Sequence, residues 1–234
     1  MADRRPDRHT TGFPDRRLAA VIFDFDGVIL DSETAQFESH RRIYERYGIA
    51  LTPDDWCHQI GVWVGLERRS ARLRELADTA PNHEAFSAEQ SSLFRDILAR
   101  EPMRGIADLI AAIARGGVPM AIASTSPSHW VVPAVERLGL RSHFPIIVTG
   151  DQVPRRKPAP DAYLEAARQL DVDPAYAVAI EDSGPGITAA TAAGLKTVAI
   201  PHWLTETHDF TAATVRVGHA GELTLDMLEE LVIG

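Results

Sequence analysis

The sequence places two aspartates, Asp24 and Asp26, directly after the apolar run Val21-Ile22-Phe23. In an extended chain, side chains two residues apart leave the backbone on the same side. Two carboxylates that pack together repel each other, which raises their pKa values. A hard divalent cation removes that penalty, and Mg²⁺ prefers oxygen ligands of this kind. The pair therefore indicates a metal site at the end of a buried strand.

Other polar side chains stand where other apolar runs end. Glu181 and Asp182 follow such a run and supply further oxygen ligands. Ser124 and Thr125 precede a predicted helix, and hydroxyls and backbone N–H groups at a helix start suit phosphate oxygens. Lys157 is one of only two lysines among 24 basic residues, and it adds a positive charge. Together these residues indicate a Mg²⁺ ion and a phosphoryl group.

Each of these features also has a structural interpretation. An Asp-x-Asp pair can belong to a loop or to a helix cap, and the Ser124-Thr125-Ser126 segment can simply cap a helix. A single lysine is usually solvated, and the segment from Glu181 to Gly184 has the composition of a turn. The joint occurrence of these features, each at the end of an apolar run, favours the chemical interpretation.

Six apolar runs are predicted as buried parallel strands because they are rich in Val, Ile and Ala and lack polar alternation. They span residues 20–25, 118–124, 144–149, 177–181, 196–200 and 213–217. Helices are predicted between them at residues 104–115, 128–138, 159–170 and 186–193. The alternation predicts a doubly wound, Rossmann-like α/β fold with a mostly parallel sheet, in which ligands bind outside the carboxyl ends of the strands.

Residues 34–100 interrupt the alternation, since they contain helical stretches and no convincing strand. They are predicted to form a helical cap domain over the mouth of the sheet. The α/β core is then discontinuous and comprises residues 18–33 and 101–234. Residues 1–17 are polar and lack the apolar segment of a secretory signal, so they are predicted as a disordered tail.

The order of these motifs resembles that of the haloacid dehalogenase superfamily, in the branch with a helical cap after the first strand. Phe23-Asp24-Phe25-Asp26-Gly27-Val28 matches its first motif and Ser124 its second. Lys157 in RRKPAPD matches the third, and Glu181-Asp182-Ser183 with GITAATAAG matches the fourth. The resemblance covers residues 18–233 and is specific for the family, though not for a substrate.

The resemblance implies a role for each matched residue. Asp24 would be the nucleophile that forms an aspartyl-phosphate, and Asp26 would protonate the leaving oxygen and then activate water. Asp24, the backbone carbonyl of Asp26, Glu181 and Asp182 would hold Mg²⁺. Ser124, Thr125 and Lys157 would bind the phosphoryl oxygens.

The resemblance also separates branches of the family. The presence of Asp26 disfavours dehalogenation, and the absence of lysine from residues 34–99 removes the phosphonatase interpretation. β-Phosphoglucomutase is the nearest competitor, but its histidine and its cap sequence Gly-Val-Ser-Arg are replaced here by Gln36 and by Gly61-Val62-Trp63-Val64. We therefore expect a phosphatase acting on a small, sugar-phosphate-like metabolite. A phosphosugar mutase and a catalytically silent binding module remain the alternatives.

The substrate is expected to contact the cap domain. Candidate residues there are Gln36, His40, Trp63 and Arg68, with the structural alternatives that Trp63 packs between helices and that the arginines form a solvated face.

Composition limits the possible partners. The net charge of −9 disfavours nucleic-acid binding, and no apolar stretch approaches the length of about 18 residues that a membrane span needs. No GxGxxG or GxxxxGK[ST] sequence supports a nucleotide-binding protein. We expect a cytoplasmic protein, monomeric or weakly dimeric.

Overall fold

The computed structural model describes residues 18–62 and 64–233 of the 234-residue chain. The predicted tail at residues 1–17 and the candidate residue Trp63 lie outside this part.

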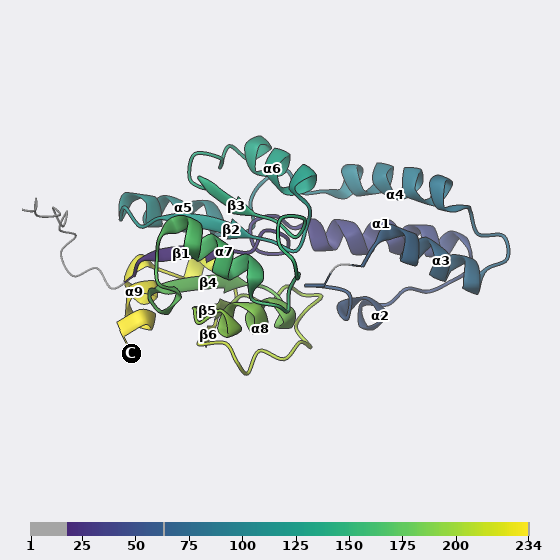
Figure 1. The fold of residues 1–234 in the computed structure, drawn as a ribbon. Coiled ribbons are helices and arrows are strands. Elements are labelled where there is room, and N and C mark those ends of the chain that lie inside the picture. Colours follow the sequence, from purple (N-terminus) through teal and green to yellow (C-terminus); the bar gives the residue numbers. More distant parts are fainter. Residues whose placement is uncertain (1–17, 63, 234) are drawn as a thin grey trace, which may run out of the picture.

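Six parallel strands form one sheet in the order β3-β2-β1-β4-β5-β6 (Figure 1). The strands are β1 (Ala20–Phe23), β2 (Met120–Ala123), β3 (Ile146–Val148), β4 (Ala177–Glu181), β5 (Lys196–Ala199) and β6 (Val215–Arg216). The chain order reverses beside β1, which pairs with β2 on one side and with β4 on the other. This is the switch point at which open α/β sheets bind their ligands.

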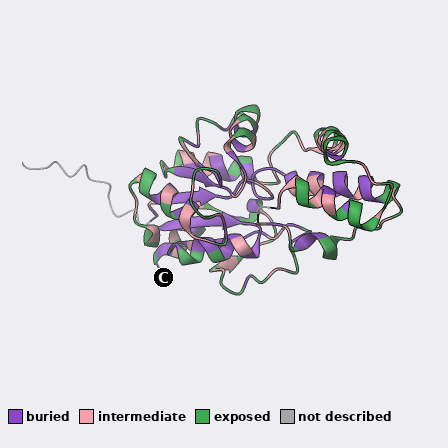
Figure 2. Ribbon diagram, turned by 45° about the vertical axis from the view of Figure 1, so that its right-hand side comes forward, coloured by how far each residue is buried: buried purple, intermediate pink, exposed green. Residues whose placement is uncertain are grey.

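Both faces of the sheet are covered, which explains why the strands are apolar without alternation. Side chains on one face, such as Val21 and Phe23, belong to a core built with α5 (Ile106–Arg115), α6 (Ser128–Arg137) and α9 (Leu225–Ile233). Ala20 and Ile22 point to the other face, against α7 (Asp161–Leu170) and α8 (Gly184–Ala192). Figure 2 shows the buried strands between the two helical layers.

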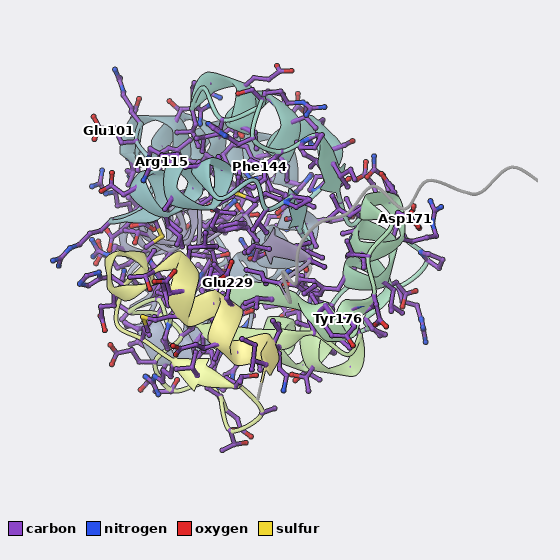
Figure 3. All side chains as sticks on the ribbon, turned by 90° about the vertical axis from the view of Figure 1, so that its left-hand side faces the viewer. Glu101, Arg115, Phe144, Asp171, Tyr176 and Glu229 are labelled. Atoms are coloured by element: carbon purple, nitrogen blue, oxygen red, sulfur yellow. The ribbon has the colours of Figure 1, made fainter. Side chains whose placement is uncertain are left out.

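The helices α5 and α9 also cover the sheet near the amino ends of its strands. Figure 3 views this side of the molecule, where Arg115 of α5 and Glu229 of α9 are labelled.

Residues between β1 and α5 form a helical insert that extends beyond the carboxyl ends of the strands (Figure 1). It contains α1 (Ser32–Arg46), α2 (Pro53–Cys57), α3 (Leu66–Leu76) and α4 (His83–Ile97). Apolar side chains of α1, α3 and α4, among them Ile43, Leu73 and Phe86, form the interior of the insert. The predicted α/β fold with a helical insert is therefore confirmed.

Several predicted boundaries differ from the structure. The strand predicted at residues 20–25 ends at Phe23, because the chain turns at the two aspartates. The first insert helix begins at Ser32, two residues before the predicted cap boundary at residue 34, since the Asp31 side chain caps it by accepting from the Thr34 N–H (3.0 Å). Helix α9 was not predicted, although Leu225, Leu228 and Val232 have helical spacing. No helix of the described residues is long and apolar enough to cross a membrane.

Candidate active site

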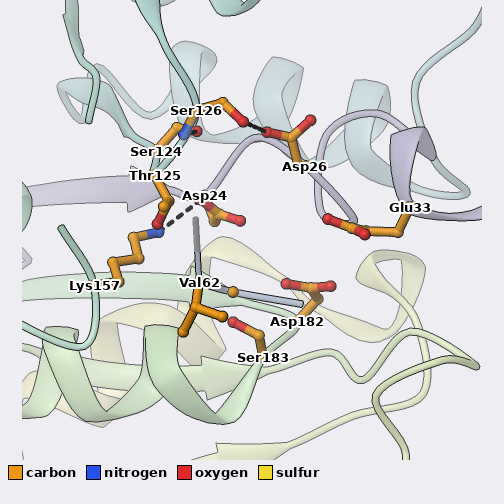
Figure 4. Close-up of a pocket in the computed structure, with 11 residues that line it drawn as sticks. Asp24, Asp26, Glu33, Val62, Ser124, Thr125, Ser126, Lys157, Asp182 and Ser183 are labelled. Carbon is orange, nitrogen blue, oxygen red and sulfur yellow. Dashed lines mark hydrogen bonds and ion pairs between the residues drawn. The ribbon is translucent and has the colours of Figure 1, made fainter. Parts of the chain in front are cut away.

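Asp24 lies at the carboxyl end of the central strand β1. Its backbone N–H donates to the Ile180 carbonyl (2.9 Å), which continues the β1–β4 ladder by one residue. The side chain is buried, and its Oδ1 accepts from Lys157 Nζ at 2.6 Å (Figure 4). The sheet therefore holds this carboxylate in a fixed position.

The chain turns directly after Asp24, and the turn requires glycine at position 27. Gly27 has φ +81°, and a Cβ there would lie 2.1 Å from Oδ2 of Asp182. Because of the turn, the Asp24 and Asp26 carboxylates have different partners. Both side chains still line one pocket, although the strand itself ends at Phe23.

Asp26 is held by three donors. Its Oδ1 accepts from the Ser32 hydroxyl (2.5 Å) and from Trp130 Nε1 (2.9 Å). Its Oδ2 accepts from the Ser126 hydroxyl (2.6 Å), a contact drawn in Figure 4. The orientation of this carboxylate is therefore set by α1, α6 and the loop after β2.

Lys157 joins the two central strand ends. Its Nζ lies 2.6 Å from Asp24 Oδ1 and 2.6 Å from Glu181 Oε1. Burial opposes the ammonium charge, but the two carboxylates together raise the pKa of Lys157 above its ordinary value. Behind it, the buried Tyr163 hydroxyl donates to the same Glu181 oxygen at 2.6 Å. One cation thus contacts two buried acids and offsets part of their charge.

Three buried carboxylates meet next to this lysine. Asp24, Glu181 and Asp182 each offer an oxygen, and these oxygens lie within 4.8 Å of one another. Burial, together with the neighbouring carboxylates, raises the pKa of Asp24 to about 8 and the pKa of Asp182 well above its ordinary value. Asp182 Oδ2 is buried and has no hydrogen-bond partner among the described residues. Such an orphan oxygen in an acidic cluster fits a hard divalent cation.

Hydroxyl groups face the acids from the loop after β2. The Ser124 N–H donates to the Val148 carbonyl (2.9 Å), which fixes the start of this loop on the sheet. Ser124 is buried, and its Oγ accepts from the Ser126 N–H (3.0 Å). The Thr125 hydroxyl is buried without a hydrogen-bond partner among the described residues. The loop can therefore accommodate the oxygens of an anion.

These groups line a small pocket of about 50 Å³, here called the inner pocket. Its lining consists of Asp24, Asp26, Glu33, Gly61, Val62, Ser124, Thr125, Ser126, Lys157, Asp182 and Ser183 (Figure 4). The structure thus brings the predicted core residues together in one region, with Glu181 directly behind Lys157.

A larger cavity of about 350 Å³, here called the outer cavity, lies between the insert and the core. It is lined by Asp26, Ser32, Glu33, Gln36, Gln59, Val62, Val64, Leu66, Arg69, Gln90, Ser91, Phe94, Ser126, Pro127, His129 and Trp130. Asp26, Glu33, Val62 and Ser126 line both spaces, so the inner pocket and the outer cavity adjoin at these residues.

Only some of the predicted cap residues line the outer cavity. Gln36 lines the outer cavity, whereas His40 is buried between Trp56 and Phe86 and does not line it. Arg68 is exposed outside the cavity, and its neighbour Arg69 lines it instead. Spacing alone did not reveal which arginine faces inward, because that depends on how α3 is rotated against α1 and α4.

Sequence reasoning missed several residues of the site. Glu33 was not singled out, although it stands two residues after Asp31 in the first turn of an apolar-faced helix. Trp130 and Tyr163 were missed as well, since nothing in their local sequence shows that they contact Asp26 and Glu181.

Comparisons with known proteins agree with this geometry. The family described as haloacid dehalogenase-like hydrolase matches residues 21–200. The phosphorylated carbohydrates phosphatase of Thermotoga maritima is 33% identical over 184 residues, which cover 77% of this chain and 84% of the relative. The fructose-1-phosphate phosphatase YqaB of Escherichia coli is 32% identical over 189 residues, 78% of this chain and 96% of the relative.

Solved structures show the same architecture. CbbY from Rhodobacter sphaeroides in complex with phosphate superimposes with a TM-score of 0.71 at 28% identity, covering 91% of this chain and 99% of CbbY. A mutant of CbbY in complex with xylulose-(1,5)bisphosphate gives the same TM-score and identity over 90% of this chain and 99% of that one.

Proposed function

The chain belongs to the haloacid dehalogenase-like hydrolases, and we propose that within this family it is a Mg²⁺-dependent phosphatase of a small, sugar-phosphate-like metabolite. The observation that carries the proposal is that the two aspartates line one pocket and have different partners. Asp24 contacts a lysine in a buried acidic cluster, and Asp26 is oriented by three donors. The names of the two phosphatase relatives support the same chemistry.

In the first half of the reaction, an Asp24 oxygen forms a bond to phosphorus while the bond from phosphorus to the ester oxygen breaks. Asp26 gives its proton to the departing oxygen, so that an alcohol leaves. The three donors around Asp26 stabilise the carboxylate that this step creates. General acid catalysis of this type contributes about 10²–10⁴ in rate.

In the second half, water attacks the phosphorus of the aspartyl-phosphate. Asp26 takes a proton from that water, the bond between Asp24 and phosphorus breaks, and inorganic phosphate leaves. Asp24 is then free again and Asp26 is protonated for the next cycle, so each group returns to its starting state.

The phosphoryl oxygens would be bound by Lys157 and by the hydroxyls of Ser124 and Thr125, which line the inner pocket. Asp24, Asp182, the Asp26 backbone carbonyl and Glu181 would hold Mg²⁺. When bound, the ion supplies positive charge to the phosphoryl oxygens as negative charge builds on them. The unpartnered Asp182 oxygen and the raised pKa values of Asp24 and Asp182 support this assignment.

Phosphate release from a panel of sugar phosphates, polyol phosphates and p-nitrophenyl phosphate tests the proposal. We expect release with Mg²⁺, no release with EDTA, and none from the Asp24→Asn variant. The variant keeps the shape of the side chain and removes its nucleophilic charge, so folding is checked by circular dichroism. Release from Asp24→Asn at the wild-type rate would contradict the proposal.

A mutase with the same site would isomerise a sugar phosphate instead of releasing phosphate. β-Glucose 1-phosphate is therefore also tested for conversion to glucose 6-phosphate with a bisphosphate primer. Isomerisation without net phosphate release would show that the substitutions in the cap do not exclude mutase activity.

A further inference from the structure

Glu33 occupies the junction between the inner pocket and the outer cavity. It lies in the first turn of α1 and lines both spaces. In Figure 4 its carboxylate points into the pocket region, facing Asp182 and Asp26 across the open space. When the phosphoryl group of a substrate lies beside Asp24, the first atoms of its leaving group must therefore lie next to Glu33.

The Glu33 carboxylate has unused hydrogen-bonding capacity. It makes no hydrogen bond and no ion pair with any other residue in ranges 18–62 and 64–233. Burial, and after it the charge of Asp26, raises its pKa to about 8, while Arg69 acts in the opposite direction. A partly buried carboxylate without donors is costly, and ligand hydroxyl groups are donors that would satisfy it.

Arg69 is the second charged group of the insert in the outer cavity. Its guanidinium lies 4.3 Å from the centroid of the Trp56 ring, and its Nη1 donates to Gln36 Oε1 at 3.4 Å. Its Nε is buried without a hydrogen-bond partner among the described residues. Stacking holds the guanidinium in place, so it can act as a fixed donor to a ligand oxygen.

The remaining polar lining is mostly uncharged. Gln59, Gln90 and Ser91 contribute amide and hydroxyl groups, and Phe94 and Trp130 contribute aromatic rings. Amide, hydroxyl and aromatic groups suit a chain or ring of hydroxyl-bearing carbons. Arg69 is the permanent cation of the described lining. A second phosphate in this cavity would therefore find Arg69 as its single permanent counter-charge among the described lining residues, beside the two acids Asp26 and Glu33.

We propose that Glu33 is a specificity residue that accepts hydrogen bonds from hydroxyls near the phosphorylated carbon, so that the substrate is the monophosphate of an uncharged polyol or sugar. Arg69 donates to an oxygen farther along the same leaving group. The inference rests on the proposed function for the phosphoryl chemistry, and it adds the class of leaving group and the residue that recognises it.

Glu33→Gln tests the proposal because it keeps the size of the side chain and replaces one acceptor oxygen with a donor. The esters are hexitol, pentitol and tetritol monophosphates, fructose 1,6-bisphosphate, and p-nitrophenyl phosphate, which has no hydroxyl. We divide kcat/KM for the best polyol phosphate by kcat/KM for p-nitrophenyl phosphate. This ratio should be ten- to hundredfold lower in Glu33→Gln than in the wild-type protein. Glu45→Gln makes the same change on an exposed position of α1 and should leave the ratio as it is.

The wild-type protein should prefer the polyol monophosphate to the bisphosphate. Equal losses on the polyol phosphate and on p-nitrophenyl phosphate would overturn the proposal, since Glu33 would then act on the phosphoryl group or on a metal. An unchanged ratio, or a preference for the bisphosphate, would overturn it as well.

Binding separates this inference from the proposed function. The dissociation constants of the polyol phosphates are measured by calorimetry with Mg²⁺ for Asp24→Asn and for Asp24→Asn with Glu33→Gln. Weaker binding to the double variant supports the role of Glu33 even if the wild-type protein releases no phosphate. If no polyol monophosphate binds, or both variants bind it equally, the inference is wrong, whatever the turnover experiments show.

Discussion

At the scale of single residues, the site depends on one buried lysine. Lys157 contacts Asp24 and Glu181, and all three side chains are buried. Arginine is used at nearly every other basic position. A compact ammonium fits between two carboxylates that approach from different strands, whereas the planar guanidinium is shaped for bidentate contact with one. This geometry accounts for a lysine in a chain that otherwise uses arginine.

Lys157→Met should reduce both stability and activity. Removing one partner of a buried ion pair costs about 3–5 kcal/mol, because the remaining carboxylates lose their compensating charge. We expect that loss in urea unfolding with EDTA, and a smaller loss with Mg²⁺, since a cation that binds the folded state replaces part of the missing charge. Phosphate release should fall by a factor of at least about 10².

Lys196→Met is the matched control for this experiment. Lys196 is the second lysine of the chain, and it lies partly exposed at the start of β5. Its replacement should leave phosphate release near the wild-type value. Equal destabilisation of Lys157→Met in EDTA and in Mg²⁺ would argue against a cation site beside Asp24.

The residues of the strand ends could be predicted from sequence, whereas those of the cavity could not. Asp24, Asp182 and Ser124 follow apolar runs, and the geometry of a parallel sheet brings such positions together. Glu33 and Arg69 face the cavity only because of the rotation of α1 and α3. That rotation is set by packing within the insert, and local sequence does not report it.

At the scale of elements, the interior of the insert contains an ionisable residue. His40 is fully buried on α1, its Nδ1 donates to the Gln36 carbonyl (2.7 Å), and its ring packs against Trp56 and Phe86. Burial, with Arg69 adding to it, lowers the pKa of His40 to about 3. The histidine therefore joins α1 to its neighbours as a neutral ring.

The His40 pKa predicts a pH dependence of stability. In the unfolded chain the imidazole binds a proton below its ordinary pKa of 6.5, but in the folded chain it does so only near 3. The free energy of unfolding should thus fall as the pH decreases from 6.5 towards 3, by up to about 1.4 kcal/mol per pH unit from this group. His40→Leu should reduce the slope of unfolding free energy against pH in that window.

Urea unfolding at several pH values measures this slope. His58→Leu controls for the loss of one histidine from the same insert, because His58 is exposed. A slope that is the same in His40→Leu and in the wild-type protein would show that His40 takes up a proton in the folded state.

Contact between the insert and the core depends on Gly61. This residue has φ +77°, and a Cβ there would lie 2.6 Å from Ser183 Oγ, beside the acidic cluster. Gly61→Ala should cost about 1–2 kcal/mol of stability for the left-handed backbone. It should also reduce kcat/KM, because the insert can no longer approach the inner pocket at the same distance.

Gly48→Ala separates the two effects. Gly48 has φ +74°, but no atom lies within 4 Å of a Cβ at that position. It should lose similar stability in urea unfolding and keep its activity on p-nitrophenyl phosphate. Equal activities of the two variants would mean that the contact between Gly61 and Ser183 is not needed for turnover.

At the scale of the whole molecule, the two connections to the insert lie side by side. The Met103 N–H donates to the Ile29 carbonyl at 2.9 Å, so the chain leaves the core and returns to it at one point. A loop of the core also reaches across to the insert. Trp203 Nε1 donates to the Thr34 hydroxyl (2.9 Å), and Leu204 packs with Phe37 and Trp56.

This arrangement supports the proposed division into a cap at residues 34–100 and a discontinuous core. Replacing residues 34–100 with a short Gly-Ser linker should give a core that unfolds in one cooperative transition, because the sheet and its two helical layers remain complete. Its stability should be lower by at least about 1.5–3 kcal/mol, since Leu204 loses its apolar contacts.

Hydrolysis of p-nitrophenyl phosphate should persist at a reduced rate. The preference for a polyol phosphate should become weaker, because Gln36, Arg69 and Gln90 are removed with residues 34–100 while Glu33 remains. Circular dichroism, urea unfolding and the kcat/KM ratio of the two esters measure these outcomes. A shortened chain without a cooperative transition would show that core and insert fold as one unit. An unchanged polyol preference would show that Gln36, Arg69 and Gln90 do not contribute to substrate recognition.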